Sequence, residues 1–372
     1  MEAWQKVLVK TEFLESQHGK MGCRFCHGGT EPAPDRQAAH QGLVPSPSAG
    51  PGGKCEGCHG QVTAAFGSTL HRTSKGIVDL QSGVLAPRVN PGKLAVLQQA
   101  VGNHCASCHT ARCGDCHVSR PAWSGGGLVQ GHSFYKTPNP VLNCTACHGS
   151  RVEKEMMGRG PEDMGLKPDV HWAPGGMACA KCHPGSWMHG SSDGYAGRYQ
   201  VKEAPRCEQC HGQKEGFNAL PAHRQHAAGG ARVTLQCQVC HGQAYNNCYG
   251  CHVGKDQKGL PFFKTDRSAF GFRIGRNAWK SPERPYDYVV VRHVPVARDT
   301  FKYYGEDLLS RFDAAPTWKY ATPHTIQRVT EQARDCRSCH NRESLFLREK
   351  DLLPDERAAN HEVVVKKLPP KL

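Results

Sequence analysis

The sequence CASCHTARCGDCH, at residues 105–117, contains the five-residue frame Cys-x-x-Cys-His twice. The same frame occurs ten times along the 372 residues and accounts for all 20 cysteines. The ten cysteine pairs are Cys23 and Cys26, Cys55 and Cys58, Cys105 and Cys108, Cys113 and Cys116, Cys144 and Cys147, Cys179 and Cys182, Cys207 and Cys210, Cys237 and Cys240, Cys248 and Cys251, and Cys336 and Cys339. The histidines that directly follow these pairs are His27, His59, His109, His117, His148, His183, His211, His241, His252 and His340.

Cys-x-x-Cys-His is the attachment signature of c-type haem. Its two thiols form thioethers with the porphyrin vinyl groups, and its histidine becomes an axial ligand of the iron. A structural zinc site uses cysteine pairs but needs no histidine after each of them. A disulfide scaffold likewise has no use for histidine at a fixed offset. We therefore expect ten covalently attached haem c groups.

The composition fits a core that is made largely of cofactor. Only 38% of the residues are hydrophobic, and the chain contains 41 glycines and 25 prolines. Such a chain buries little apolar surface to offset the entropy that it loses on ordering. Ten porphyrins would supply that surface. The sequence thus predicts mostly irregular loops with short α-helices wrapped around a chain of covalently bound haems, and an apoprotein that does not fold alone.

The formal charge of +14 would by itself suggest an anionic partner. Ten haems bring about 20 negative propionate charges, and ten ferric centres add about 10 positive ones. The holoprotein then carries about −6 when reduced (14 − 20) or +4 when oxidised (14 − 20 + 10). We interpret the Lys and Arg excess as partners of the propionates. No basic run or nucleic-acid motif indicates nucleic-acid binding.

The spacing of the motifs is uneven, which excludes a short solenoid repeat. Successive motifs start 32, 50, 8, 31, 35, 28, 30, 11 and 88 residues apart. Two tight cassettes, at 105–117 and 237–252, are expected to bring two haems each into near contact. Residues 55–72 and 207–224 align without gaps with eight identities, and each precedes a cassette. We favour an ancient duplication over chance similarity.

This organisation predicts two parts. Residues 1–260 would form a nine-haem body, and residues 261–372 a C-terminal section with the tenth haem. Within the body, the duplicated stretches would be 55–117 and 207–252.

Two segments of the C-terminal part have regular patterns. YDYVVVRHVPV, at residues 286–296, is the one clear strand pattern, and we expect minimal β-structure elsewhere. Residues 324–350 have helical composition and should place the tenth motif on or beside a helix.

Twelve histidines lie outside the motifs, and ten haems need ten sixth ligands. Bis-histidine ligation keeps iron low-spin and closed to substrates, which suits electron transfer. The ten that we select are His18, His40, His71, His132, His171, His189, His223, His226, His293 and His324. His361 lies in a polar tail and should be exposed. The choice between His293 and His104 stays open. Methionine ligation, which would raise the potentials, is the alternative.

Haem c is attached outside the cytoplasm, so we expect an exported chain that is periplasmic, extracellular or on the cell surface. Residues 1–20 contain no apolar stretch long enough for a signal peptide, and no segment could span a membrane. We interpret the sequence as the mature form. Because all cysteines lie in motifs, no lipid anchor through cysteine is expected.

The whole chain resembles multihaem c-type cytochromes, specifically the decahaem group with bis-histidine haems. Phrases that flank the motifs are also similar to those of metal-reducing and related anaerobic or thermophilic bacteria: SQHGKMGCRFCHGG (16–29), DVHWAPGGMACAKCH (169–183) and WKYATPHTIQ (318–327). The resemblance implies haems spaced for tunnelling and a role in periplasmic or extracellular electron transport. The decahaem cytochromes of porin–cytochrome conduits tend to spread their motifs over two five-haem halves. This chain differs, because nine motifs are followed by a long gap and then by a single tenth motif.

We therefore expect an electron carrier or conduit rather than an enzyme. Its partners would be redox proteins, including other multihaem cytochromes or an outer-membrane conduit, and self-assembly into filaments is compatible with this role. The alternative is a multihaem reductase or oxidase that acts on a nitrogen or sulfur oxyanion at one open haem. Such enzymes often carry an altered motif such as Cys-x-x-Cys-Lys, whereas all ten motifs here end in histidine.

Overall fold

The structure is a computed structural model that describes residues 9–50, 53–73, 75–78, 84–109, 111–118, 132–190, 198–227, 233–266 and 268–372. Its contacts divide the chain into two compact units. The first unit comprises Met1–Ser74, Ala106–His148 and Cys179–Tyr195, and the second comprises Lys75–Cys105, Gly149–Ala178 and Ala196–Leu372. The expected C-terminal section thus belongs to the same unit as residues 196–260. The division at residue 260 stays a prediction.

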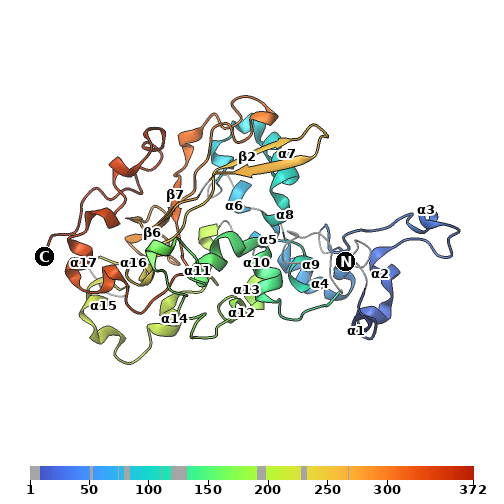
Figure 1. Ribbon diagram of the computed structural model, residues 1–372, viewed down its shortest axis with the longest axis horizontal. Helices are drawn as coiled ribbons and strands as arrows, with labels where there is room; N and C mark the ends of the chain where they lie inside the picture. Colours follow the sequence, from blue (N-terminus) through green and yellow to red (C-terminus); the bar gives the residue numbers. More distant parts are fainter. Residues whose placement is uncertain are drawn as a thin grey trace. The chain divides into compact units, whose positions relative to one another are not determined.

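The first unit consists of short helices joined by loops (Figure 1). They are α1 (Thr11–Leu14), α2 (Cys23–His27), α3 (Arg36–Ala39), α4 (Glu56–Phe66), α5 (Leu70–Thr73), α8 (Ala106–His109), α9 (Cys113–His117), α10 (Thr145–His148), α12 (Cys179–Cys182) and α13 (Gly185–Met188). All but α4 are five residues or shorter, so neither helix propensity nor length can hold them in place. Their stability must come from what packs against them.

The second unit combines helices with three small antiparallel sheets. Its helices are α6 (Lys75–Val78), α7 (Leu94–His104), α11 (Lys154–Met156), α14 (Cys207–His211), α15 (Pro221–His226), α16 (Cys237–His241) and α17 (Cys336–His340). Its strands are β1 (Tyr245–Asn246), β2 (Cys251–Lys255), β3 (Pro261–Thr265), β4 (Phe270–Gly271), β5 (Ile274–Arg276), β6 (Tyr288–His293) and β7 (Trp318–Tyr320). The sheets pair β1 with β4, β2 with β3, and β5, β6 and β7 in that order.

Strand β6 is the centre of the largest sheet and confirms the strand predicted within 286–296. Its β-branched run Val289, Val290 and Val291 is fully buried, because β6 is covered on both faces. Val290 pairs with Ile274 of β5, and Val291 pairs with Tyr320 of β7. The additional strands show that β-structure extends beyond the expected segment.

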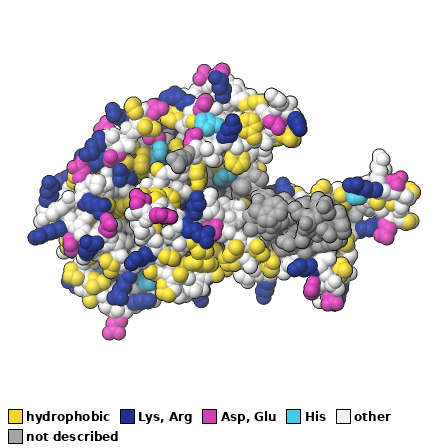
Figure 2. Space-filling model, in the orientation of Figure 1, with side chains coloured by type: hydrophobic (Ala, Val, Ile, Leu, Met, Phe, Trp, Pro, Cys, Tyr) yellow, Lys and Arg dark blue, Asp and Glu magenta, His cyan; other side chains and the backbone are white. Residues whose placement is uncertain are grey.

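The apolar cores of the described residues all lie in the second unit. One cluster packs α7 against residues 296–312, a second surrounds Val289 and Val291, and a third surrounds Val290 and Val239. In the described part of the first unit no hydrophobic residue is buried. Instead, apolar side chains there remain exposed, including Phe25 at 54% and Val141 at 52%. Figure 2 shows hydrophobic side chains at the surface among Lys and Arg.

Short helices and small antiparallel sheets are thus confirmed, with 41% of the residues helical and 11% in strands. The wrapping of this chain around haems stays a prediction. The tenth motif does lie on a helix, α17. Among the described residues, none of the helices has the length and apolar character needed to cross a membrane.

Candidate cofactor sites

Most motifs form one short helical turn of their own. Helices α2, α9, α14, α16 and α17 each begin at the first cysteine of a motif and end at its histidine. On a helix, residues at i, i+3 and i+4 share one face. Both thiols and the imidazole of each of these five motifs therefore point to the same side. In α17 the Asp335 carboxylate caps this turn by accepting a hydrogen bond of 2.8 Å from the Ser338 N–H.

Seven motif histidines face a histidine from outside the motifs. The pairs, with the distance between ring centroids, are His27 and His132 (5.9 Å), His59 and His18 (6.4 Å), His117 and His189 (5.8 Å), His148 and His71 (6.2 Å), His211 and His171 (6.0 Å), His241 and His223 (6.3 Å), and His340 and His226 (6.2 Å). Four pairs lie in the first unit and three in the second. Each recorded pair joins one motif histidine with one from outside the motifs.

These distances fit an iron atom between the two rings. A metal–imidazole bond is about 2.0–2.1 Å long, and the bonding nitrogen lies about 1.1 Å from the ring centre, which places two axial rings about 6.2–6.4 Å apart. Ordinary aromatic pairs also fall within about 4.5–7 Å, so the distance alone does not identify a ligand pair. What favours ligand pairs is the identity of the partners: each of the seven contacts joins a motif histidine with a different histidine from outside the motifs.

Backbone carbonyls orient several of these rings through the other nitrogen. His27 Nδ1 lies 3.0 Å from the Val44 carbonyl oxygen, and His117 Nδ1 lies 2.7 Å from that of Tyr135. The same contact holds His340 Nδ1, 2.8 Å from the Pro370 carbonyl oxygen. A ring that donates from Nδ1 leaves Nε2 as the electron-pair donor for a metal.

Burial favours the neutral form of several of the rings. It lowers the pKa of His132, His189 and His226, and it lowers the pKa of His183 to about 4. A neutral imidazole is the form that binds a metal. His132 also has a φ of 52°, an uncommon left-handed conformation for a residue with a side chain. Such strain is often found at functional positions.

First cysteines of different motifs also meet. Thiol hydrogen bonds join Cys55 with Cys113, Cys144 with Cys179, and Cys207 with Cys237. The hydrogen bond from Cys55 lowers the pKa of Cys113 to about 7. Since each thiol marks the edge of a porphyrin in the proposed cofactor, these contacts would make the corresponding haems neighbours.

The ninth motif differs from the others. Its Cys251 and His252 lie in strand β2 instead of a helix. The His252 ring contacts two carboxylates: Nε2 lies 3.2 Å from Asp266, and Nδ1 lies 3.4 Å from Asp299. The Nδ1 contact resembles the usual support of a metal-bound histidine. The Asp266 carboxylate, however, lies where Nε2 would bind iron, so it must move for a haem to bind here.

The sixth ligands of the third motif, with His109, and of the sixth motif, with His183, stay predictions. His183 packs against Trp187, with ring centroids 4.6 Å apart. Each of these two motif histidines is still expected to be paired with a histidine from outside the motifs.

The five remaining histidines have other surroundings. The His40 Nδ1 lies 2.5 Å from the Arg36 carbonyl oxygen, and His361 is exposed, as expected for the tail. The choice between His104 and His293 stays open, since each ring has a polar partner. His104 Nε2 lies 2.8 Å from the Tyr304 hydroxyl, and His293 Nε2 lies 2.7 Å from Glu356.

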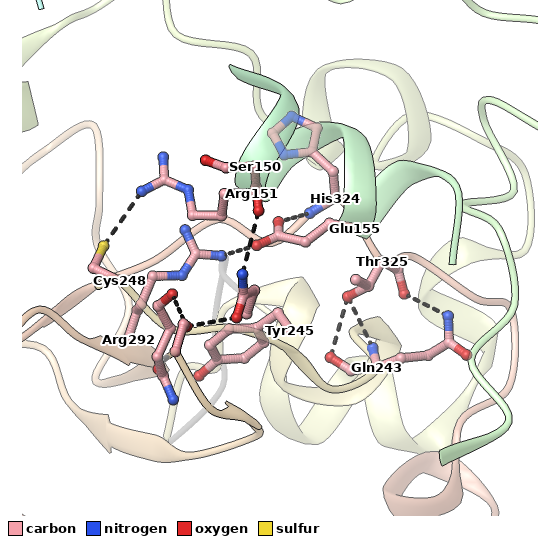
Figure 3. Close-up of polar contacts among 12 residues, drawn as sticks. Ser150, Arg151, Glu155, Gln243, Tyr245, Cys248, Arg292, His324 and Thr325 are labelled. Atoms are coloured by element: carbon pink, nitrogen blue, oxygen red, sulfur yellow. Dashed lines mark hydrogen bonds and ion pairs between the residues drawn. The ribbon is translucent and has the colours of Figure 1, made fainter. Parts of the chain in front are cut away.

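His324 lies at a buried charge cluster beside the ninth motif (Figure 3). Its backbone N–H donates to Glu155 Oε2 at 3.0 Å, while Glu155 Oε1 pairs with Arg292. The side chains of Glu155 and Arg292 are only 1% and 6% exposed. Arg151 Nη1 lies 3.6 Å from Cys248 Sγ. Burial raises the pKa of Glu155 against the opposing effect of Arg292. No sequence pattern indicated this cluster, whose members are far apart along the chain.

The described residues contain no group of three or more His, Cys, Asp or Glu side chains placed to hold a metal ion. Each histidine pair offers two ligands, which is the number that a haem iron leaves open. Comparisons with protein-family models, curated proteins and solved structures found no match to the chain.

The two similar stretches, 55–72 and 207–224, place their corresponding histidines differently. His71, on α5, faces His148 of the fifth motif, whereas His223, on α15, faces His241 of the eighth motif. In the first copy, the histidine thus reaches past the cassette that follows it. In the second copy, it reaches the first motif of the cassette. Both histidines thus face a motif histidine, but the two motifs do not correspond to each other in the two stretches.

Proposed function

We propose that this chain is a decahaem c-type cytochrome that carries electrons and performs no chemistry on a substrate. The observation that carries the proposal is the set of seven histidine pairs, each with one ring from a Cys-x-x-Cys-His motif. When bound, haem supplies an iron that alternates between ferric and ferrous states and so holds one electron per site. The paired imidazoles would hold such an iron from both sides, and this ligation would keep it low-spin.

The missing core of the first unit supports covalent haem. That unit contains six of the motif histidines and buries no described hydrophobic residue. A folded unit without apolar burial would have nothing to offset its loss of conformational entropy. Porphyrin rings between the histidine pairs would cover side chains such as Phe25 and Val141.

We propose an exported location, periplasmic or extracellular, because haem c is attached outside the cytoplasm. The partners would be other redox proteins, including multihaem cytochromes or an outer-membrane conduit. Assembly into filaments is compatible with the same role.

One observation favours the alternative, a reductase or oxidase of a nitrogen or sulfur oxyanion. His252 is held by two carboxylates and not by a second imidazole. If the ninth haem binds at its motif, its sixth position is the best candidate for an open one. Arg151, whose Nη1 lies 3.6 Å from Cys248 Sγ, would place a cation at the edge of that haem, whereas Arg292 is already paired with Glu155.

The test is stoichiometric. Exported protein is analysed by intact mass, by the pyridine haemochrome spectrum and by thiol alkylation. Ten haems and no reactive thiol are expected. A chain with bound zinc, or with disulfides such as Cys55 to Cys113 in place of thioethers, would refute the proposal.

A further inference from the structure

Asp169 is a buried carboxylate attached to one of the paired rings. Its side chain is 7% exposed, and its Oδ1 accepts hydrogen bonds from the His171 N–H at 2.8 Å and from His171 Nδ1 at 3.0 Å. Its Oδ2 accepts a hydrogen bond of 2.8 Å from the Ile326 N–H. Three hydrogen bonds thus fix the carboxylate, so the orientation of the His171 ring opposite His211 is fixed as well.

The neighbouring site is built differently. Its two rings, His223 and His241, carry only neutral partners on Nδ1: the Phe217 carbonyl oxygen at 2.8 Å and the Gln327 carbonyl oxygen at 3.1 Å. The two sites adjoin, because the thiols of Cys207 and Cys237 are hydrogen-bonded. The two sites therefore differ in the carboxylate behind His171, which has no counterpart behind His223 or His241.

A carboxylate and a carbonyl that accept a hydrogen bond from Nδ1 change the electron donation of the imidazole to a metal by different amounts. The carboxylate draws the Nδ1 proton more strongly, which makes the ring a stronger electron donor to a metal at Nε2. Its negative charge, held in a poorly solvated place, also stabilises the more positive oxidation state. Both effects favour ferric over ferrous iron and lower the reduction potential.

We propose that Asp169 is a positioning residue that lowers the reduction potential of the site held by His171 and His211 below that of the site held by His223 and His241. The inference rests on the proposed function, since it requires haem at both sites. It gives this part of the chain a preferred direction, from the seventh motif toward the eighth.

The experiment compares the reduction potentials of the ten-haem protein and its variants by spectroelectrochemical titration. Asp169→Asn keeps an acceptor for His171 Nδ1 but removes the charge. The matched control is Glu208→Gln, which removes a charge within the same motif. Glu208 accepts hydrogen bonds from the Tyr286 hydroxyl at 2.7 Å and from Cys237 Sγ at 3.6 Å, and it has no recorded contact with an imidazole.

In Asp169→Asn, one of the potentials should shift upward, while Glu208→Gln should shift that potential clearly less, because the Glu208 charge acts only through space and not through an imidazole. An unchanged set of potentials in Asp169→Asn, or an equal upward shift in Glu208→Gln, would overturn the role of Asp169. If Asp169→Asn does not assemble ten haems, Asp169→Glu serves instead. It keeps the charge but displaces the carboxylate, so a smaller upward shift is expected and no shift overturns the proposal.

The haem count of the wild-type protein separates this inference from the proposed function. Wild-type protein without haem at Cys207 and Cys210 would contradict the proposed function. Ten haems with potentials that do not respond to Asp169 would contradict only the inference.

Discussion

His226 faces His340 with ring centroids 6.2 Å apart, although the two residues lie in distant parts of the sequence. His223, one helical turn earlier on α15, faces His241 at 6.3 Å. A six-residue helix thus offers rings to two different motifs, the eighth and the tenth. Proline at the first position of α15 fixes the start of this helix.

Replacing His226 with alanine should open one iron site. The variant is expected to show a high-spin ferric signal from about one haem in ten, because a bis-histidine iron loses one strong ligand. Electron paramagnetic resonance and the high-spin absorption band measure this change. His361→Ala is the control, since the His361 ring is exposed and its Nδ1 lies 2.8 Å from the Ala358 carbonyl oxygen. A high-spin signal from His361→Ala but none from His226→Ala would contradict the pairing.

Ferric protein as isolated should be low-spin if all ten sites are closed. Cyanide added at neutral pH should then bind slowly or not at all. If one site is open, we expect it at the ninth motif, because the His252 ring contacts Asp266 and Asp299. A high-spin signal that disappears in a Cys248→Ala, Cys251→Ala double variant would support the reductase alternative. A signal that persists in this variant would point to another site.

When the chain is produced in a compartment without haem attachment, we expect the second unit of the apoprotein to be more ordered than the first. The second unit has apolar clusters of its own, such as that of Val289 and Val291, whereas the described first unit has no buried hydrophobic residue. Hydrogen exchange should therefore be slow in part of residues 270–365 and fast throughout residues 9–50 and 53–73. Equal protection of both segments would show that the first unit folds without cofactor.

Breaking the buried ion pair should destabilise the protein strongly. Arg292→Ala leaves the Glu155 carboxylate buried without its partner, at a cost of about 3–5 kcal/mol in the free energy of unfolding. Arg159→Ala is the control, because Arg159 is 64% exposed where it pairs with Glu153, and such pairs contribute about 0–1 kcal/mol. Urea titration of the two variants compares them. A similar loss in both would mean that the Glu155–Arg292 pair is not specially costly to break.

The sequence alone was sufficient for the local chemistry. Two cysteines and a histidine at i, i+3 and i+4 need only one helical turn to share a face, and nine of the ten motifs overlap short helices. Strand β6 was predictable as well, because a run of β-branched residues encodes its own extended conformation. These features depend on neighbours in the sequence. His361 is exposed as expected, but the polar tail that was the reason for this expectation is wrong, because Asn360 and Val363 beside it are buried.

Only the tertiary structure decided which ring faces which. The pairs of His18 with His59 and of His171 with His211 depend on how loops far apart in the sequence return to one another. The similarity of residues 55–72 and 207–224 suggested that His71 and His223 are equivalent, yet His71 faces the fifth motif and His223 faces the eighth. No sequence pattern predicted that the ninth motif lies in a strand. Nor did a pattern predict that the Asp169 carboxylate contacts His171. The spacing of residues in a motif indicates local geometry. A pair of facing histidines is brought together by long-range packing, and such packing leaves no pattern in a single sequence.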